Sequence, residues 1–168
     1  MGLKTLILVR HAKAVDKAAT GHDFDRTLTE KGRRDAQVMG ARLYEMNLRP
    51  DRILSSPAPR AYETAAILAK ATGHREEVIA AETMYQSEIE TLLGLIRDTD
   101  ARVSSLMLVG HNPEFTYLMM YLCGITEGHM PKAGVAEIRM RIPSWDKAGK
   151  GSGQLRYFGS PKNEQLAL

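Results

Sequence analysis

Two short runs of consecutive apolar residues constrain the fold of this chain most strongly. The first is Leu6–Val9, at the end of a strand predicted over residues 3–9, and the second is Leu106–Val109. Runs of this length without polar alternation predict strands that are buried on both faces, as in parallel sheets covered by helices. We therefore expect a mainly parallel sheet with helices on both sides.

The segments between these runs alternate between helical and extended patterns. Expected helices cover residues 29–46, 60–72, 87–97 and 113–122, and further strands cover residues 52–55, 77–81, 135–142 and 155–158. Such alternation, in a chain of 168 residues, predicts the α/β class: a single-domain three-layer α/β/α sandwich spanning residues 1–168. Residues 13–25 are expected to form a loop, residues 147–153 a hairpin turn, and the tail from about residue 163 to be loose.

Composition and charge exclude several classes of partner. The net charge is +3, aromatic residues make up 6%, and no dense run of Lys and Arg occurs, so we expect no nucleic-acid partner. No apolar stretch approaches the length of a membrane span, so we expect no membrane partner. The single cysteine, Cys123, cannot form an internal disulfide, which favours a reducing, cytoplasmic location. The sequence leaves the oligomeric state open, with a monomer favoured.

One region of the chain is more basic than the rest. Residues 129–162 contain seven Lys and Arg against two acidic residues, Glu137 and Asp146. Such an excess usually marks a solvated face, and it also favours an acidic protein partner.

Polar residues with chemical potential follow the strands directly. Arg10 and His11 come after the first apolar run, and His111 and Asn112 come after the second. Arg60 begins the helix that follows the strand at residues 52–55. The carboxyl ends of parallel strands meet at one edge of a sheet, so these side chains are expected to converge there.

These residue types suit phosphoryl transfer. A neutral imidazole is a nucleophile toward phosphorus, and two guanidinium groups can bind phosphoryl oxygens in a forked geometry. A second histidine can donate a hydrogen bond to the transferring group. Lys13 and Asn112 flank these residues and are further candidates for phosphate contact.

The chain has no HExxH, CxxC, carboxylate cluster or glycine-rich P-loop, so no metal and no cofactor are expected.

Four short motifs resemble those of the histidine phosphatase superfamily, which has the phosphoglycerate mutase-like fold. They are Leu8-Val9-Arg10-His11-Ala12, Asp25-Arg26-x-Leu28-Thr29-x-x-Gly32, Ser55-Ser56-Pro57-x-x-Arg60-Ala61-x-x-Thr64-Ala65 and Gly110-His111-Asn112-Pro113. The resemblance covers about residues 3–160 and is nearest to the short SixA-like phosphohistidine phosphatase subgroup. It implies that His11 is the phosphorylated nucleophile and that Arg10, Arg60 and His111 complete the phosphate pocket.

The chain departs from the superfamily pattern at two places. Ala12 stands where most members have glycine, which marks the SixA-like subgroup. Mutases and many phosphatases of the superfamily also place an acid after the second helix. In this chain Glu82 lies near that point, and Gln86, which cannot donate a proton at neutral pH, fits it better. Whether Glu82 or another residue acts as a general acid stays open.

The predicted function is hydrolysis of phosphohistidine in a partner protein, through a covalent phospho-His11 intermediate. Only fifty residues separate Arg60 from His111, too few for a lid domain, and the resulting open pocket suits a phosphoryl group carried by a protein. One alternative is a broad small-molecule phosphomonoesterase of the same superfamily or, less readily, a mutase. Another is a phosphoprotein-binding module without turnover.

Overall fold

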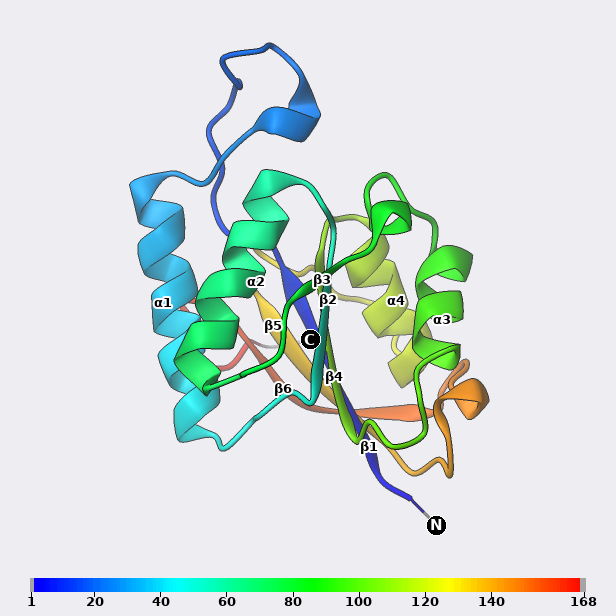
Figure 1. The fold of residues 1–168 in the computed structure, drawn as a ribbon. Helices are drawn as coiled ribbons and strands as arrows, with labels where there is room; N and C mark the ends of the chain where they lie inside the picture. The colour runs from blue at the N-terminus through cyan, green and yellow to red at the C-terminus, as the bar shows by residue number, and fades with distance from the viewer. Residues whose placement is uncertain (1, 167–168) are drawn as a thin grey trace.

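The computed structural model describes residues 2–166 and forms a six-stranded sheet between two layers of helices (Figure 1). The strands are β1 (Lys4–Arg10), β2 (Arg52–Ser55), β3 (Ile79–Ala80), β4 (Ser105–Gly110), β5 (Val135–Met140) and β6 (Gly153–Gly159). The helices are α1 (Glu30–Glu45), α2 (Pro59–Thr72), α3 (Ile89–Arg97) and α4 (Glu114–Cys123), with short 3₁₀ turns η1 (Asp23–Asp25), η2 (Glu82–Met84) and η3 (Trp145–Lys147).

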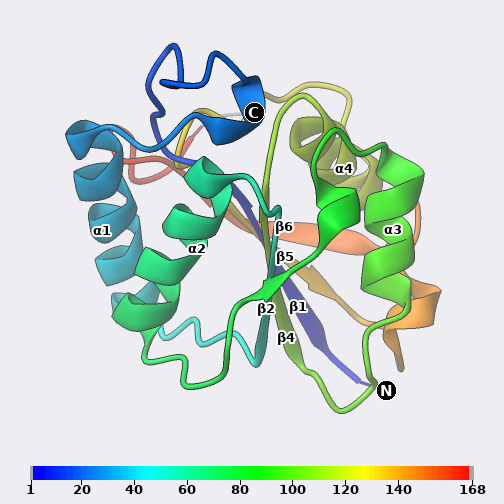
Figure 2. The same cartoon turned by 45° about the horizontal axis from the view of Figure 1, so that its top comes forward.

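The strand order is β3-β2-β4-β1-β5-β6, and the first four strands are parallel. Only β5 runs in the opposite direction, because it pairs antiparallel with both β1 and β6. Helices α1 and α2 cover one face of the sheet, and α3 and α4 cover the other (Figures 1 and 2). The predicted three-layer α/β/α sandwich with a mainly parallel sheet is confirmed.

The first apolar run is continuous because β1 is buried on both faces. Leu6 and Leu8 pack into the cluster under α3 and α4, whereas Ile7 and Val9 pack into the cluster under α1 and α2. All four side chains are at most 1% exposed. Burying each of them is worth about 1.5–3 kcal/mol, so the strand that carries His11 is fixed from both sides.

The start of α1 is joined to the segment that follows His11. The Thr29 side chain caps the helix by accepting a hydrogen bond from the Gly32 amide at 2.9 Å. A Cβ atom at Gly32 would collide with the backbone carbonyl of Lys13, so only glycine allows this approach. The helix lies within one residue of the predicted span at each end.

Other boundaries shift at the edges of the sheet. The strand predicted over residues 77–81 pairs with β2 only at Ile79–Ala80, and the predicted hairpin is formed by β5 and β6. Where a loose tail is predicted, the Leu166 amide donates to the Phe158 carbonyl at 2.6 Å, so the chain returns to β6. Residues 167–168 of that tail lie outside the described residues. None of the described helices has the length and apolar character needed to cross a bilayer.

Candidate active site

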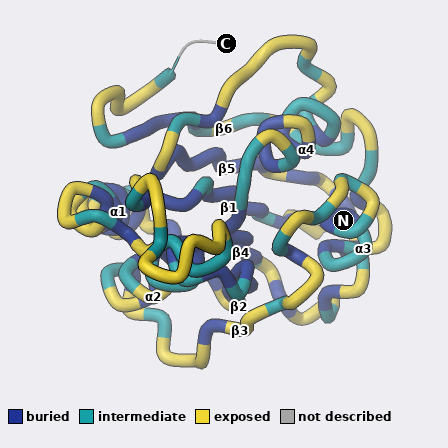
Figure 3. Tube along the Cα trace, turned by 90° about the horizontal axis from the view of Figure 1, so that it is seen from above, coloured by how far each residue is buried: buried dark blue, intermediate teal, exposed yellow. Residues whose placement is uncertain are grey.

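The predicted side chains converge at the carboxyl edge of β1, β4 and β2, where exposed connections surround buried strand ends (Figure 3). Arg10 pairs in register with Gly110, and the His11 amide donates to the Gly110 carbonyl at 3.0 Å. The rings of His11 and His111 lie with their centroids 5.3 Å apart. Two histidines a hundred residues apart in sequence thus become neighbours because their strands pair in parallel.

Backbone geometry fixes which nitrogen of His11 is free to react. Its Nδ1 lies 2.7 Å from the carbonyl oxygen of Ala12. A carbonyl can only accept, so Nδ1 carries the proton and Nε2 carries the lone pair. Burial lowers the pKa of His11 to about 4, since desolvation outweighs the Ala12 hydrogen bond, and nearby Arg60 and Arg10 lower it further. His11 is therefore a neutral imidazole at pH 7, the form that can attack phosphorus.

His111 is held at the same edge by a buried serine. Its Nε2 lies 2.8 Å from the hydroxyl oxygen of Ser56, a side chain with no exposed surface. Burial lowers the pKa of His111 to about 3, and the neighbouring His11 adds to the effect. Both histidines are thus uncharged near neutral pH, and the positive charge of the site comes from arginines.

Arg10 and Arg60 are each bound to neighbouring groups through the terminal nitrogens of the guanidinium. Arg10 donates from Nη1 to the Met130 carbonyl at 3.0 Å, and Arg60 donates from both terminal nitrogens to Asp23. The Nε atoms of both arginines are buried and have no hydrogen-bond partner within the described part of the chain. Both guanidinium groups lie close enough to His11 for their charge to lower its pKa, so this edge of the sheet is electropositive and favours an anionic ligand.

Asn112 and Arg10 share a hydrogen-bond acceptor, the backbone carbonyl of Met130. The Asn112 side-chain nitrogen donates to the Met130 carbonyl at 2.8 Å, and its side-chain oxygen accepts from Thr116 at 2.9 Å. Asn112 therefore holds the carbonyl that in turn holds the Arg10 guanidinium. Its predicted contact with phosphate stays a prediction.

A loop residue that the sequence analysis did not select completes the surroundings of Arg60. The Asp23 carboxylate accepts from Arg60 at 3.0 Å, from Arg26 at 2.9 Å and from the Tyr85 hydroxyl at 2.9 Å. These bonds, with Arg26 and then Tyr85 contributing most, lower the pKa of Asp23 to about 2. Asp23 is therefore a carboxylate across the physiological pH range. Arg26 belongs to the motif that begins at Asp25, and that motif is the sequence signal that could have pointed to it.

Tyr85 is the residue of the 81–87 segment that reaches the site. Its ring meets those of Phe24 and His111 edge-on, with centroids 4.9 Å and 5.7 Å away. Glu82 and Gln86, the two residues weighed as an acid or its replacement, are exposed. No side-chain hydrogen bond joins either of them to the site in the described part of the chain. The 81–87 segment thus contributes the ring and hydroxyl of Tyr85 to the site, and neither Glu82 nor Gln86.

The titratable side chains offer no evident metal centre. No three His, Cys, Asp or Glu residues among those that the structure describes are grouped so that they could hold a metal ion. The independence of catalysis from metals stays a prediction.

Comparison with known proteins agrees with this geometry. Residues 6–95 match the family model described as the histidine phosphatase superfamily, branch 1. An uncharacterised protein of Picosynechococcus sp. is 34% identical over 80% of this chain and 84% of its own length. The structure assigned as the phosphohistidine phosphatase SixA of Agrobacterium tumefaciens is 31% identical, with a TM-score of 0.80, over 94% of this chain and 98% of that one.

A further relative has a different named substrate. The mitochondrial serine/threonine-protein phosphatase Pgam5 of Drosophila ananassae is 38% identical over 74 residues. That match covers 44% of this chain and only 25% of Pgam5.

Proposed function

Because the chain belongs to the histidine phosphatase superfamily, branch 1, and has a SixA-like fold, we propose that this phosphatase hydrolyses phosphohistidine on a protein substrate through a phospho-His11 intermediate. The observation that carries the proposal is the free Nε2 of His11, which lies beside His111 and near enough to the guanidinium groups of Arg10 and Arg60 for their charge to act on it. One nucleophile and two forked donors are the elements needed to hold and transfer a phosphoryl group.

The proposed cycle has two displacements at phosphorus. In the first, the Nε2 lone pair of His11 forms a bond to phosphorus while the substrate N–P bond breaks, and the departing imidazole nitrogen takes a proton from solvent. In the second, water attacks phospho-His11, inorganic phosphate leaves, and the imidazole regains its lone pair. Arg10 and Arg60 neutralise the phosphoryl oxygens in both steps.

The choice of phosphohistidine rests on the absence, among the described residues, of a carboxylic acid placed to protonate a leaving group. The Tyr85 hydroxyl donates to Asp23 and its pKa is raised by burial, so it is a weak acid. An alkoxide leaves only with help from a general acid, which is typically worth about 10²–10⁴-fold in rate. Asp23 stays ionised, because its pKa lies at about 2, and Glu82 is exposed without a bond to the site. Imidazole leaves readily once it is protonated. The similarity to a protein assigned as SixA supports the same choice.

A panel of substrates tests the proposal. We expect kcat/KM for a phosphohistidine peptide to exceed that for a phosphoserine peptide or 3-phosphoglycerate by at least about 10²-fold, the scale of general-acid help. An aryl phosphate, whose phenolate leaves easily, should also be hydrolysed. The variant Glu82→Gln is the matched control and should change none of these ratios.

The same panel tests the second candidate, a protein phosphoserine or broad phosphomonoesterase activity. The similarity to the serine/threonine-protein phosphatase Pgam5 favours it. Comparable kcat/KM values for all substrates, with a selective loss for phosphoserine in Glu82→Gln, would identify that activity and replace the phosphohistidine assignment.

A further inference from the structure

A groove of about 390 Å³ opens beside Arg10 of the active site. Its basic lining consists of Arg10, Lys13, Lys31, Lys132 and Lys162, with Asp35 as the acidic residue among the side chains that line it. The groove is therefore cationic and shares Arg10 with the proposed phosphate pocket.

Most of this charge is not neutralised by the protein itself. Lys31 pairs with Asp35 at 2.8 Å. The side chains of Lys13, Lys132 and Lys162 are exposed, and none of them forms an ion pair with the described residues. A concave surface lined by one sign of charge concentrates ligands of the opposite sign.

The lysines come from separate segments of the chain. Lys13 follows β1, Lys31 lies in the first turn of α1, Lys132 precedes β5 and Lys162 follows β6. The fold thus collects cations from four places onto one groove at the mouth of the site. This groove also explains part of the positive excess found in residues 129–162.

We propose that this groove binds an acidic segment that flanks the phosphohistidine in the substrate protein. The inference rests on the proposed function, because the groove begins at the residue that would hold the phosphoryl group. Carboxylates seated on Lys13, Lys132 and Lys162 place the adjoining phosphoryl group at Arg10. Exposed ion pairs of this kind act mainly on encounter and selectivity, so their effect falls with salt.

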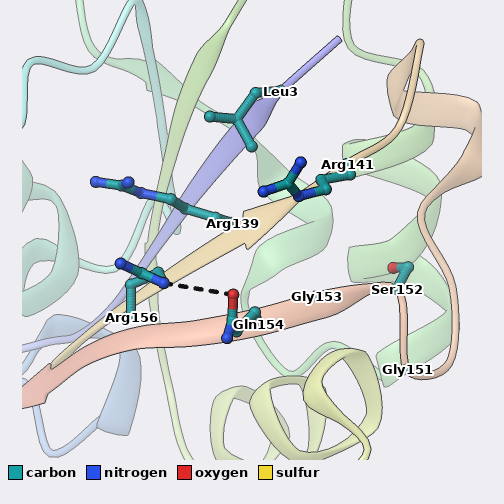
Figure 4. Close-up of a pocket in the computed structure, with 8 residues that line it drawn as sticks. All are labelled: Leu3, Arg139, Arg141, Gly151, Ser152, Gly153, Gln154 and Arg156. Atoms are coloured by element: carbon teal, nitrogen blue, oxygen red, sulfur yellow. Dashed lines mark hydrogen bonds between the residues drawn. The ribbon is translucent and has the colours of Figure 1, made fainter. Parts of the chain in front are cut away.

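A second basic pocket provides the matched comparison. It has a volume of about 400 Å³ and is lined by Arg139, Arg141 and Arg156 beside Leu3 (Figure 4). Arg139 and Arg141 flank Met140, which pairs with Lys4 at the start of β1. The pocket therefore lies at the opposite end of β1 from Arg10. There Glu137 pairs with Arg139 at 2.8 Å, and no predicted site residue is near. This pocket is also basic, with three arginines against the five basic residues of the groove, and none of the predicted site residues lines it.

The experiment compares two synthetic phosphohistidine peptides, one flanked by glutamates and one by serines. At about 0.02 M salt the wild type should have a roughly tenfold higher kcat/KM for the glutamate peptide, and at about 0.3 M the ratio should fall toward one. The variant Lys132→Glu/Lys162→Glu should lose the preference at low salt. The control Arg139→Glu/Arg156→Glu should keep it.

Binding of an unphosphorylated glutamate peptide, followed by fluorescence anisotropy, separates the groove from the chemistry. The wild type should bind it, and Lys132→Glu/Lys162→Glu should bind at least about fivefold more weakly. If no phosphohistidine peptide is hydrolysed while an aryl phosphate is, the proposed function fails and this measurement still decides the groove. Three outcomes would overturn the proposal. The wild type could have equal kcat/KM for both peptides at low salt, or the control variant could lose the preference as fully as Lys132→Glu/Lys162→Glu does. In the same binding assay, the groove could bind ATP, a phosphate-bearing anion, and not the glutamate peptide.

Discussion

The two arginines of the proposed phosphate pocket are held in opposite ways. Arg10 lies on β1, and its guanidinium rests on a neutral carbonyl, that of Met130, which Asn112 also binds. Arg60 lies on α2, and its guanidinium rests on the carbonyl and the charged carboxylate of Asp23. The Asp23 side chain is 56% exposed, whereas that of Arg60 is 5% exposed. One half of the pocket is thus anchored in the fold, and the other half is closed from outside by a loop.

This difference suggests that one half of the pocket carries out bond making at phosphorus, whereas the other half tunes the charge around the phosphoryl group. The strand ends supply the proposed nucleophile His11 and its neighbour His111 in a fixed register, so a change there is expected to affect bond making. The loop residues Asp23 and Arg26 bind to groups that already stand in place, and a change there affects mainly how much charge is available to the phosphoryl group. Predictions on the two halves should therefore differ in size.

The largest effect is expected at the strand end. His11→Ala removes the atom that accepts the phosphoryl group, so kcat should fall by at least about 10³-fold while the fold is retained. Brief incubation of the wild type with substrate, quenched and analysed by mass spectrometry, should show acid-labile phosphate on His11. The exposed histidine His129 lines the neighbouring groove, so the control His129→Ala is assayed with an aryl phosphate, for which it should retain activity. Activity of His11→Ala near that of the control would refute the covalent mechanism.

The sequence predicts the strand-end half because its signals are local. The runs that end at Val9 and Val109 are apolar on every residue, since each faces one of two cores, and the residues that follow must stand at the sheet edge. Parallel pairing then brings His11 beside His111. Both steps need only the pattern of burial and the rule for parallel sheets.

Asp23 and its partner Tyr85 were missed because their contacts are distant in sequence and their residue types are unremarkable. Asp23 lies 37 residues from Arg60 and 62 residues from Tyr85, and an exposed loop carries no periodic pattern that would join them. The search for an acid in the 81–87 segment considered carboxylates and amides, so the hydroxyl of Tyr85 went unnoticed. Asn112 was selected for its place next to His111, yet the direction of its side chain depends on Met130 and Thr116.

An intermediate effect is expected from acid, and it tests how deeply the strand-end half is buried. The pKa values of His11 and His111 fall from 6.5 to about 4 and about 3 in the folded protein. Between pH 6.5 and 4 the unfolded chain therefore binds more protons than the folded one, and the free energy of unfolding falls as the pH falls. From pH 7.5 to pH 5 the loss should be about 2 kcal/mol for one histidine and at most about 4 kcal/mol for the coupled pair.

Urea unfolding at the two pH values measures this loss. His111→Gln should remove about half of it, because one of the two buried imidazoles is gone. The window stops at pH 5 so that Asp23, whose pKa is about 2 in the folded protein against an ordinary 3.8, contributes little. A pH-independent free energy of unfolding in the wild type would mean that the histidines are solvated.

The smallest effect is expected in the loop half, where one substitution removes the contrast between the two arginines. Asp23→Asn removes the charge and keeps one acceptor oxygen, which can serve either Arg60 or Arg26, since these two bind different oxygens of the carboxylate. Arg60 then rests on neutral groups, as Arg10 does. A unit charge near the phosphoryl group in a solvent-exposed setting is worth about 0.5–1 kcal/mol, so inorganic phosphate should bind roughly twofold to fivefold more tightly. Competitive inhibition of aryl phosphate hydrolysis measures this affinity, and Asp16→Asn, an exposed aspartate in the same loop, is the control for net charge. Weaker phosphate binding in Asp23→Asn would show that the carboxylate's main effect is to orient Arg60, and the loop would then belong with the strand ends as part of the fixed machinery.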